Sequence, residues 1–349
     1  MTDEHSPYMP PTDPGYTPPP NHAAPDHGGF VPHVPLTELQ LATDRLRQEV
    51  RKVIVGQEEV VELLLIALLS DGHVLIEGAP GLAKTLMAKL LARCVRTGFS
   101  RVQFTPDLMP SDLIGTSVFD PRTTAFEFRP GPIFSNIVLV DEINRAPAKT
   151  QSALFEAMEE RQVTVDGRTY PLAPPFMVVA TQNPIEQEGT YRLPEAQLDR
   201  FFFKLNVGYP TVEDETAILM RAQQGRELLS ADAIIPVIGP EELERARWLT
   251  RQVRCEEKLL RYIAAIVDRT RHDGSLMLGA SPRASLAILS ASRSSAAVSG
   301  RDFVTPEDVQ AMAPHVLRHR VQLTPEREME GLSPDQVVQQ LVKQIEVPR

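Results

Sequence analysis

The chain has 349 residues and a mass of 38.8 kDa, with 42% hydrophobic and 23% charged residues. At roughly 150 residues per domain, this length allows about two domains, each able to bury a core without disulfide or metal staples. The 36 basic and 46 acidic residues give a net charge of -10, which argues against non-specific binding to nucleic acid or to anionic lipid.

Cysteine usage and the apolar pattern exclude further classes. Cys94 and Cys255 are the two cysteines and have no CxxC partner, so a disulfide framework or a cysteine-based zinc site is excluded. The N-terminus has neither a basic region nor an apolar stretch of the kind that begins a signal peptide. No apolar run approaches the ~20 residues that span a bilayer. We therefore expect a soluble, cytoplasmic protein without membrane insertion.

The amino-terminal segment differs in composition from the rest of the chain. Residues 1–35 hold 10 of the 31 prolines and four of the eight histidines, and Arg45 is the first basic residue. Such a stretch has too few aliphatic residues to offset the entropy of ordering it, so residues 1–37 are predicted to be a disordered tail. Its irregularly spaced histidines favour a solvated tail over a metal site. A partner could read Pro18-Pro19-Pro20 as a polyproline helix, although a solvated tail is favoured here too.

Residues 38–209 are predicted to form an α/β domain. From Leu39 to Val53 the apolar positions recur at steps of three and four, which indicates one face of a helix, and a second helical pattern covers residues 58–69. Short apolar runs then alternate with helical patterns, which is typical of a parallel sheet covered on both faces. The predicted strands are 73–77, 102–104, 137–140, 176–181 and 201–205, and the helices between them include 85–95 and 149–160.

Residues 210–349 are predicted to form a second, all-helical domain, because the strand pattern stops at Pro210. Helix-start signals recur in this half of the chain as N-cap residues, first-turn prolines and capping boxes. They are Thr211 with Asp214, Ser281-Pro282, Thr305-Pro306 with Asp308, and Ser333-Pro334, which opens a last helix reaching Ile345.

The strongest chemical signal is the loop Gly78-Ala79-Pro80-Gly81-Leu82-Ala83-Lys84-Thr85, between a predicted strand and a predicted helix. Backbone N–H groups at such a helix start surround a phosphate group. Lys84 would reach the outer phosphates, and the Thr85 hydroxyl would bind Mg²⁺. Ala83 stands where glycine normally precedes the lysine. Alanine is tolerable there if the residue has right-handed helical dihedrals, since alanine resists the left-handed region.

Two acids follow the apolar run at 137–140, which places both at the carboxyl edge of the sheet beside the phosphate loop. Asp141 would hold Mg²⁺ through water, and Glu142 would take a proton from the attacking water. Asn183 ends another strand with an amide that could orient this water, although Asn183-Pro184 alone would indicate only a turn.

Six motifs in this order resemble the MoxR family of AAA+ ATPases over about residues 40–320. The alanine before the lysine is similar to the form found in that family. The resemblance implies an AAA+ P-loop core with a helical lid domain, assembled into a ring that is usually a hexamer. The motifs are Val55-Gly56-Gln57, the phosphate loop, VLVDEINRAP from Val138, ATQNP from Ala180, LPEAQLDRF from Leu193 and GASPRA from Gly279.

The resemblance also implies roles for single residues. ATP and Mg²⁺ are the implied cofactors, and residues 78–85 match the Walker A motif. Asp141 and Glu142 match Walker B, Asn183 matches sensor 1, and Val55 and Gly56 resemble the segment beside the adenine.

Two arginines match residues that stabilise the charge of the γ-phosphate. Arg200 matches the arginine finger that reaches the neighbouring subunit, and Arg283 matches sensor 2 on the lid. A planar guanidinium suits both roles, since it meets phosphate oxygens with two donors. The simpler alternatives are a salt bridge of Arg200 with Asp199 or Glu195, and an Arg283 that faces water in the first turn of a helix.

Two insertions are candidates for contact with a substrate. Residues 119–132 alternate Phe126 and Phe128 with polar positions, which suggests a hairpin inserted in a helix, and Asp166-Gly167 is a strong hairpin turn within residues 163–171. In rings of this kind such hairpins face the pore or an adaptor; equally, the two phenylalanines could be core residues. Asn144-Arg145 could link the nucleotide to a neighbour or cap the next helix.

Three functions are compatible with these motifs. The family resemblance favours chaperone-like remodelling of a protein client, often beside a protein with a von Willebrand factor A domain. The ATPase subunit of a metal-chelatase complex is close in fold. A nucleic-acid motor is disfavoured, because residues 36–349 carry a net charge of -6 and contain no stripe of aromatic and basic residues.

Overall fold

The computed structural model describes residues 34–183, 191, 193–223 and 234–348. The predicted tail lies outside the described residues except for its last four, and two of these, Val34 and Leu36, are buried. The packed part of the chain therefore begins before residue 38, because these two apolar side chains add to the core formed by the first helix.

Five parallel strands form the central sheet, in the order β2-β5-β8-β1-β9. This confirms the predicted α/β fold with a parallel sheet. Each predicted strand is present, with its ends no more than three residues from the predicted ones. The strands are β1 (Val74–Gly78), β2 (Phe99–Gln103), β5 (Ile137–Asp141), β8 (Met177–Gln182) and β9 (Phe203–Val207).

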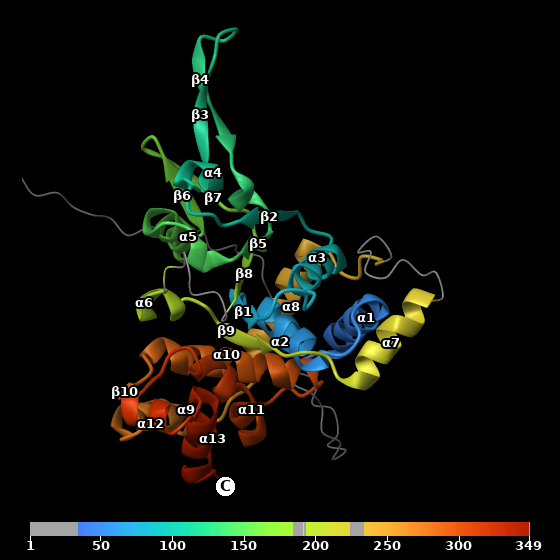
Figure 1. The fold of residues 1–349 in the computed structure, drawn as a ribbon. Coiled ribbons are helices and arrows are strands. Elements are labelled where there is room, and N and C mark those ends of the chain that lie inside the picture. The colour runs from blue at the N-terminus through green and yellow to red at the C-terminus, as the bar shows by residue number, and fades with distance from the viewer. Residues whose placement is uncertain (1–33, 184–190, 192, 224–233, 349) are drawn as a thin grey trace, which may run out of the picture. The chain divides into compact units, whose positions relative to one another are not determined.

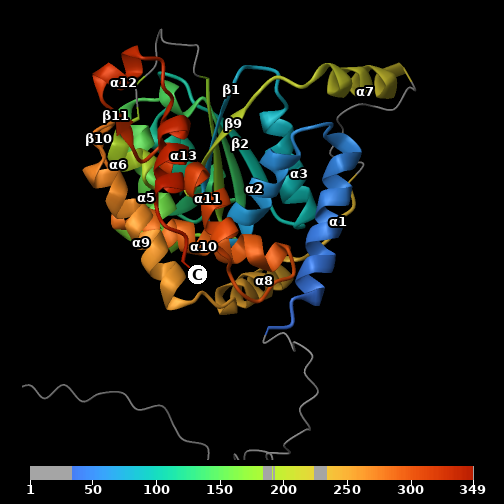
Figure 2. The same cartoon turned by 90° about the horizontal axis from the view of Figure 1, so that it is seen from below.

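Helices cover both faces of the sheet, so its strands are apolar on both sides (Figure 1, Figure 2). Val74 and Ile76 pack into the same core as α1 (Thr37–Val53), α2 (Glu58–Leu69) and α3 (Lys84–Cys94). Leu75 points the other way, toward the core formed with α4 (Pro110–Ile114) and α5 (Ala148–Glu160). This alternation follows from the period of two along a strand.

Helices α7–α13, called the lid below, make up most of the described chain after Pro210. The capping boxes predicted at Thr211 and Thr305 are present, with Asp214 and Asp308 accepting from the two threonine amides. One feature was not predicted: β10 (Leu276–Leu278) and β11 (Gln322–Leu323) form a small antiparallel ladder, too short to show an alternating pattern. The helices are α7 (Val212–Gln223), α8 (Pro240–Gln252), α9 (Glu257–His272), α10 (Pro282–Val298), α11 (Pro306–Leu317), α12 (Pro325–Met329) and α13 (Pro334–Gln344).

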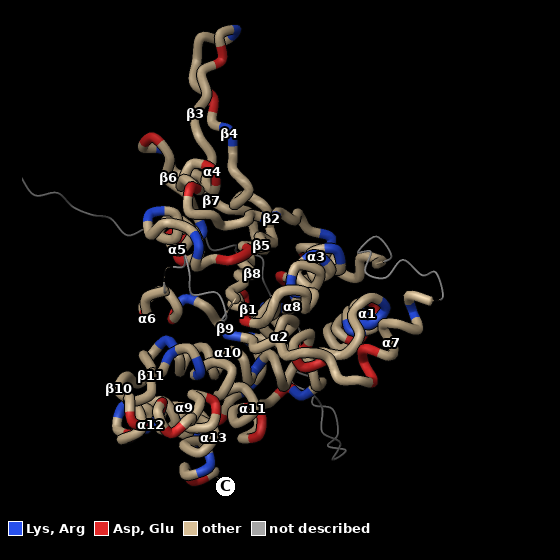
Figure 3. The backbone as a smooth tube through the Cα atoms, in the orientation of Figure 1, with Lys and Arg blue, Asp and Glu red and all other residues tan. Residues whose placement is uncertain are grey.

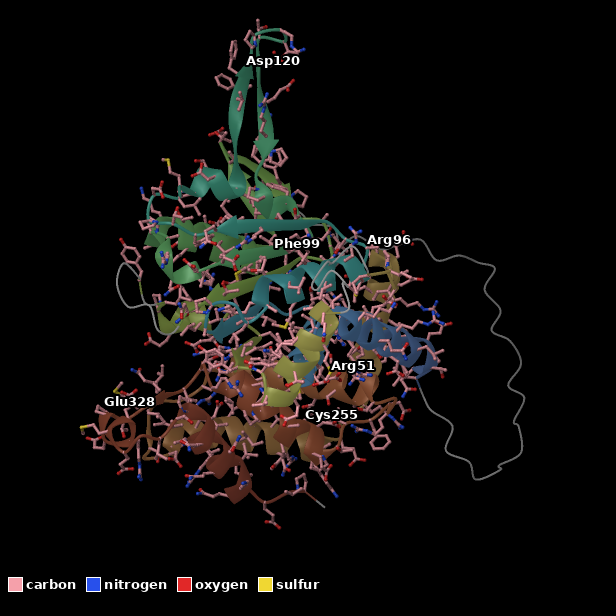
Figure 4. The ribbon with its side chains drawn as sticks, turned by 45° about the vertical axis from the view of Figure 1, so that its right-hand side comes forward. Arg51, Arg96, Phe99, Asp120, Cys255 and Glu328 are labelled. Atoms are coloured by element: carbon pink, nitrogen blue, oxygen red, sulfur yellow. The ribbon has the colours of Figure 1, made fainter. Side chains whose placement is uncertain are left out.

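Both predicted hairpins are present. The first, β3 (Gly115–Asp120) with β4 (Ala125–Pro130), lies between α4 and the single turn η1 (Pro132–Phe134), and Figure 4 shows Asp120 near its outer end. The second joins β6 (Gln162–Val165) to β7 (Arg168–Pro171). At its turn Asp166 and Gly167 have φ values of 50° and 75°. Two successive positive φ values are those of the turn that suits a two-residue hairpin.

The aromatic residues of the first hairpin share one face. Phe119 pairs with Phe126 across the strands, and their side chains are 49% and 70% exposed, so the suggestion that Phe126 is a core residue is wrong. Phe128 is partly buried because it stacks on Tyr170 of β7, with ring centroids 4.1 Å apart. The stack of Phe128 on Tyr170 therefore joins the two hairpins to each other.

In the part of the chain that the structure describes, none of the helices combines the length and the apolar composition that crossing a membrane requires.

Candidate active site

The phosphate loop connects β1 to the first turn of α3. Gly81 has φ +84°, and a Cβ atom placed there would meet nothing within 4 Å, so the loop is open on that side. Ala83 has φ 55° and ψ 18°, in the left-handed region. The expectation that Ala83 has right-handed helical dihedrals is therefore wrong. The residue is the N-cap of α3, where the chain must turn before the helix begins.

Lys84 and Thr85 open α3 directly after this turn. The ammonium group of Lys84 donates to the carbonyl oxygens of Gly78 and Ala79, the latter at 3.3 Å. The charge thus lies against the loop, where a phosphate group would meet it together with the N–H groups of the helix start. This arrangement fits the chemistry of a bound nucleotide.

A small apolar cavity adjoins the loop, with a volume of about 100 Å³. Val55, predicted to lie beside the adenine, lines this cavity, but Gly56 does not. Gly56 instead has φ +69° and approaches Asp214, so it serves the turn before α2. The lining residues are Val53, Ile54, Val55, Gln57, Gly81, Leu82, Ala83, Met87, Pro210 and Ile218.

Asp141, the last residue of β5, is buried and both of its carboxylate oxygens are engaged. Oδ2 accepts from Arg101 Nε at 2.6 Å, and Oδ1 accepts from the Thr181 hydroxyl at 3.0 Å. The guanidinium group of Arg101 therefore already balances the negative charge of this carboxylate. Mg²⁺ prefers oxygen ligands and keeps several waters. The carboxylate of Asp141, the Thr85 hydroxyl and the phosphates of a nucleotide would form a ligand set of that type.

No group of three or more His, Cys, Asp or Glu residues within the described ranges could hold a metal ion.

Glu142 follows with a strained backbone. Its φ of 56° is left-handed, a conformation that non-glycine residues adopt mainly where the surrounding structure holds them. The amide of Glu142 donates to the Thr181 hydroxyl at 3.1 Å, and its carboxylate forms an ion pair with Arg145 at 2.7 Å. Thr181 thus connects the two acids, and Arg145 holds the carboxylate predicted to be the base.

Asn183 directly follows β8, which lies between β1 and β5 in the sheet. Its side chain is buried. The carboxyl ends of these three strands carry the phosphate loop, Asn183 and the pair Asp141-Glu142. The structure therefore brings the residues predicted to bind and cleave the nucleotide to one edge of the sheet.

Arg200 lies at the opposite edge. The amide of Phe202 donates to the carbonyl oxygen of His73, just before β1, so residues 199–202 sit at the amino ends of the strands. Arg200 Nη1 donates to the carbonyl oxygen of Phe155 at 2.9 Å, and Nη2 pairs with Glu159 at 2.9 Å. The alternative of an ion pair with Asp199 or Glu195 is not what the structure shows.

Arg283, in the first turn of α10, reaches the same acid. Its Nη2 pairs with Glu159 Oε1, while Arg200 pairs with Oε2. Arg283 is half exposed, but it does not simply face water. One carboxylate of α5 thus gathers both predicted arginines, away from the edge that carries the phosphate loop.

Comparison with known proteins now gives the family. A family model described as "ATPase family associated with various cellular activities (AAA)" matches residues 73–203, and one described as "AAA lid domain" matches residues 268–341. Chaperone MoxR1 of Mycobacterium tuberculosis is 44% identical over 96% of this chain and 89% of its own length. The chain belongs to the MoxR family of AAA+ ATPases.

Two further relatives share nearly the whole length. The uncharacterized protein YeaC of Bacillus subtilis is 46% identical over 86% of this chain and 93% of its own. A crystal structure from Cytophaga hutchinsonii, 39% identical, superposes with a TM-score of 0.83 over 90% of this chain and 97% of the other.

The role of Asn144-Arg145 was left open by the sequence. Capping of the next helix is not observed, since the N-cap of α5 is Pro147, without a side-chain cap bond. Arg145 pairs with Glu142, and the carbonyl oxygen of Asn144 accepts from the amide of Tyr191 at 2.6 Å. In this MoxR-family chain the dipeptide therefore contacts the predicted base and Tyr191.

Three side chains at these two edges were not found from the sequence: Arg101, Glu159 and Thr181. Thr181 lies within the ATQNP motif, one strand position from a residue that pairs with β5, and that placement could have drawn attention to it. Arg101 and Glu159 carry no such signal, because charged residues of this kind are common on exposed faces.

Proposed function

We propose that this chain hydrolyses ATP with Mg²⁺ as a subunit of a homo-oligomeric ring, a hexamer, and uses the cycle to remodel or mature a protein client in the cytoplasm. One observation carries the proposal. The phosphate loop, Asp141 and Glu142 lie at one edge of the sheet, whereas Arg200 and Arg283 lie at the other. A phosphate site completed by these arginines needs a second copy of the chain.

Each residue at the carboxyl edge has a proposed task. Lys84 binds the outer phosphates, Thr85 and Asp141 hold Mg²⁺, and Asn183 orients the attacking water. Glu142 accepts a proton from that water after its carboxylate has separated from Arg145. The residues around Val55 contain the base of the nucleotide. Mg²⁺ would neutralise part of the negative charge on the phosphate oxygens, which phosphoryl transfer requires.

The arginines act on the neighbouring subunit in this proposal. Glu159 holds both guanidinium groups on the surface at the amino edge. Charge on the γ-phosphate oxygens rises in the transition state, and an arginine finger in related chemistry contributes ~10³–10⁵ in rate. In this proposal the site becomes complete when Arg200 leaves Glu159 and binds the γ-phosphate in the neighbouring subunit.

The client contact is proposed for the aromatic face of the first hairpin. Phe119 and Phe126 are exposed, and Figure 3 shows both signs of charge along this hairpin. Exposed aromatic residues on a projecting element are suited to contact with apolar segments of another protein. The name of the relative Chaperone MoxR1 agrees with a chaperone-like role. A protein with a von Willebrand factor A domain is the proposed partner.

We also retain the division into a nucleotide-binding domain at 38–209 and a lid at 210–349 as part of the proposal. The two family matches, at 73–203 and 268–341, lie inside these ranges.

A trapping experiment tests the function. Glu142→Gln is expected to bind ATP and stall before hydrolysis, so that it retains the client in the native cell. Lys84→Ala binds little ATP and is the blank. Proteins recovered with Glu142→Gln alone, and lost again with Phe126→Ser in the same background, would support remodelling through the hairpin. Recovery of a metal-chelatase subunit, or of nucleic acid, would instead identify one of the other two functions.

A mixing experiment tests the arginine. Arg200→Ala and Lys84→Ala rings are each expected to hydrolyse ATP slowly, for different reasons. In a mixed ring, an intact phosphate loop from one variant meets an intact Arg200 from the other. Activity should therefore reappear on mixing, and its complete absence would contradict action between subunits.

A further inference from the structure

A buried arginine of the lid is bonded to the turn that carries Arg200. The side chain of Arg320 is 3% exposed. It donates five hydrogen bonds, which matches the five N–H donors of a guanidinium. Within the lid it reaches only the carbonyl oxygen of Val316, at 2.6 Å; the four other bonds cross to residues 199–202, called the finger turn below.

These four bonds surround Arg200 on both sides in sequence. Asp199 accepts twice, at its carboxylate Oδ1 (2.7 Å) and at its carbonyl oxygen (3.1 Å). The carbonyl oxygens of Phe201 and Phe202 accept at 2.6 and 3.2 Å. Hydrogen bonds between an arginine and a carboxylate are charge-assisted and short, so the bond to Asp199 is the strongest of the set.

Two further lid residues complete the contact. The ring nitrogen Nε2 of His319 donates to the carbonyl oxygen of Phe201 at 2.9 Å, and the Ser281 hydroxyl donates to Asp199 Oδ2 at 2.9 Å. Ser281 is the N-cap of α10, two residues before Arg283. The lid thus binds the backbone of the finger turn. Arg283 follows two residues after Ser281, so it lies beside the same contact.

The finger turn is held by its own domain chiefly through its amides and one ring. The amides of Asp199, Arg200 and Phe201 donate to carbonyl oxygens of the short helix α6 (Glu195–Leu198), and the buried ring of Phe201 packs against Phe155. The amide of Phe202 reaches His73, but the carbonyl oxygens of Asp199, Phe201 and Phe202 all point to Arg320. A shift of the lid would therefore move the backbone that carries Arg200.

We propose that Arg320 is the positioning residue for Arg200: it ties the finger turn to the lid, so that the position of the lid decides whether Arg200 reaches the γ-phosphate of the neighbouring subunit. The inference rests on the proposed role of Arg200. The effect is sensitive because a displacement of ~1 Å at a reacting group can cost about 10²-fold in rate.

The test compares Arg320→Lys with a matched control, Arg318→Lys. Lysine keeps the charge of residue 320 but lacks the planar fork that serves several acceptors at once. Arg318 is also a largely buried lid arginine, but its ion pair is with Asp335 of α13 rather than with the finger turn. Each variant is assembled as the full chain and assayed for ATP hydrolysis, alone and mixed with Lys84→Ala.

Arg320→Lys is expected to lower kcat by about 10- to 100-fold, with KM for ATP changed less than about threefold, because its own phosphate loop is intact. Mixing with Lys84→Ala subunits should raise the activity several-fold above that of Arg320→Lys alone, since those subunits supply a correctly held Arg200. Arg318→Lys should keep the kcat of the parent. A merely structural role of Arg320 would not be corrected by subunits that cannot bind nucleotide.

The outcomes separate this inference from the proposed function. If Arg200→Ala is slow and rescued on mixing, but Arg320→Lys keeps the parental kcat or is slow without rescue, the positioning role alone is overturned. If Arg200→Ala itself keeps full activity, the finger assignment fails and the inference fails with it. Should Arg320→Lys not assemble, Asp199→Asn provides the same test from the other end, since it removes the charged acceptor while keeping the volume.

Discussion

The hydroxyl of Thr181 donates to Asp141 Oδ1 at 3.0 Å, and both residues are buried. The same hydroxyl accepts from the amide of Glu142, so a single oxygen atom fixes the end of β5 at both acids. Removal of the Thr181 hydroxyl would leave Asp141 Oδ1 and the amide of Glu142 without this partner. Such a loss costs roughly 1–3 kcal/mol.

Thr181→Val, which keeps the shape of the side chain, is therefore expected to lower ATP turnover by about 10- to 100-fold and to raise the Mg²⁺ concentration for half-maximal activity. Thr181→Ser retains the hydroxyl and should recover most of the rate. Steady-state assays across a Mg²⁺ series distinguish the two. A parental rate in Thr181→Val with a loss in Thr181→Ser would argue that the methyl group, not the hydroxyl, matters.

On the proposed role of Asp141, Arg101 would compete with Mg²⁺ for its carboxylate. Arg101→Met should lower the Mg²⁺ concentration needed for nucleotide binding, because the cation no longer displaces a guanidinium from Oδ2. Arg101 is 54% exposed, so solvent screens the pair and the change should be no more than about fivefold. Binding of a fluorescent ATP analogue to the Glu142→Gln form measures it without turnover. Arg122→Met, at the exposed hairpin end, is the control that should leave the Mg²⁺ curve in place.

Ala83 carries a backbone strain that glycine would relieve. An L-residue in the left-handed region costs roughly 1–2 kcal/mol, while glycine adds about 0.4–1 kcal/mol of unfolded-state entropy. Ala83→Gly should thus stabilise the protein by about 0.5–1 kcal/mol, measured as a higher midpoint in urea. Ala265→Gly, at an exposed interior position of α9, should instead destabilise it by a similar amount. A lower midpoint for Ala83→Gly would show that the methyl group makes contacts that outweigh the strain.

Burial lowers the pKa of His73 to about 3, aided by the nearby charges of Arg161 and Arg247. The unfolded chain then binds the proton more readily than the folded one. Stability is fully present above about pH 6.5 and falls as the pH drops from there toward 3, by at most about 1.4 kcal/mol per pH unit for this residue. His73→Gln should show a shallower loss in urea unfolding between pH 7 and 5. Parallel losses in both proteins would assign the acid sensitivity to other groups.

Much of the fold could be predicted because it depends on local patterns. The strand ending at Asp141 is entirely apolar up to that residue, and the helix start at Ser281-Pro282 combines an N-cap with a first-turn proline. The phosphate loop was found for the same reason. Its residues are consecutive, and the chemistry depends on their order.

Other features depend on contacts between distant residues. Arg320 and Asp199 are 121 positions apart, and neither has a neighbour in sequence that indicates the other. The pairing of Arg200 and Arg283 with Glu159 likewise required the docking of α10 on α5. The helix was predicted from Thr85 but begins at Lys84, so Ala83 is its N-cap, and the left-handed dihedrals of that residue were not predicted.

The five residues of β1 separate the two edges of the sheet by roughly 16 Å. On the proposed roles, a lone chain holds a nucleotide site that its own arginines cannot complete. Turnover per chain should then depend on how much protein is present and fall steeply on dilution, even at saturating ATP. In cells that make little of this protein, most copies would remain unassembled and inactive. Hydrolysis would begin only when the concentration was high enough for copies to assemble.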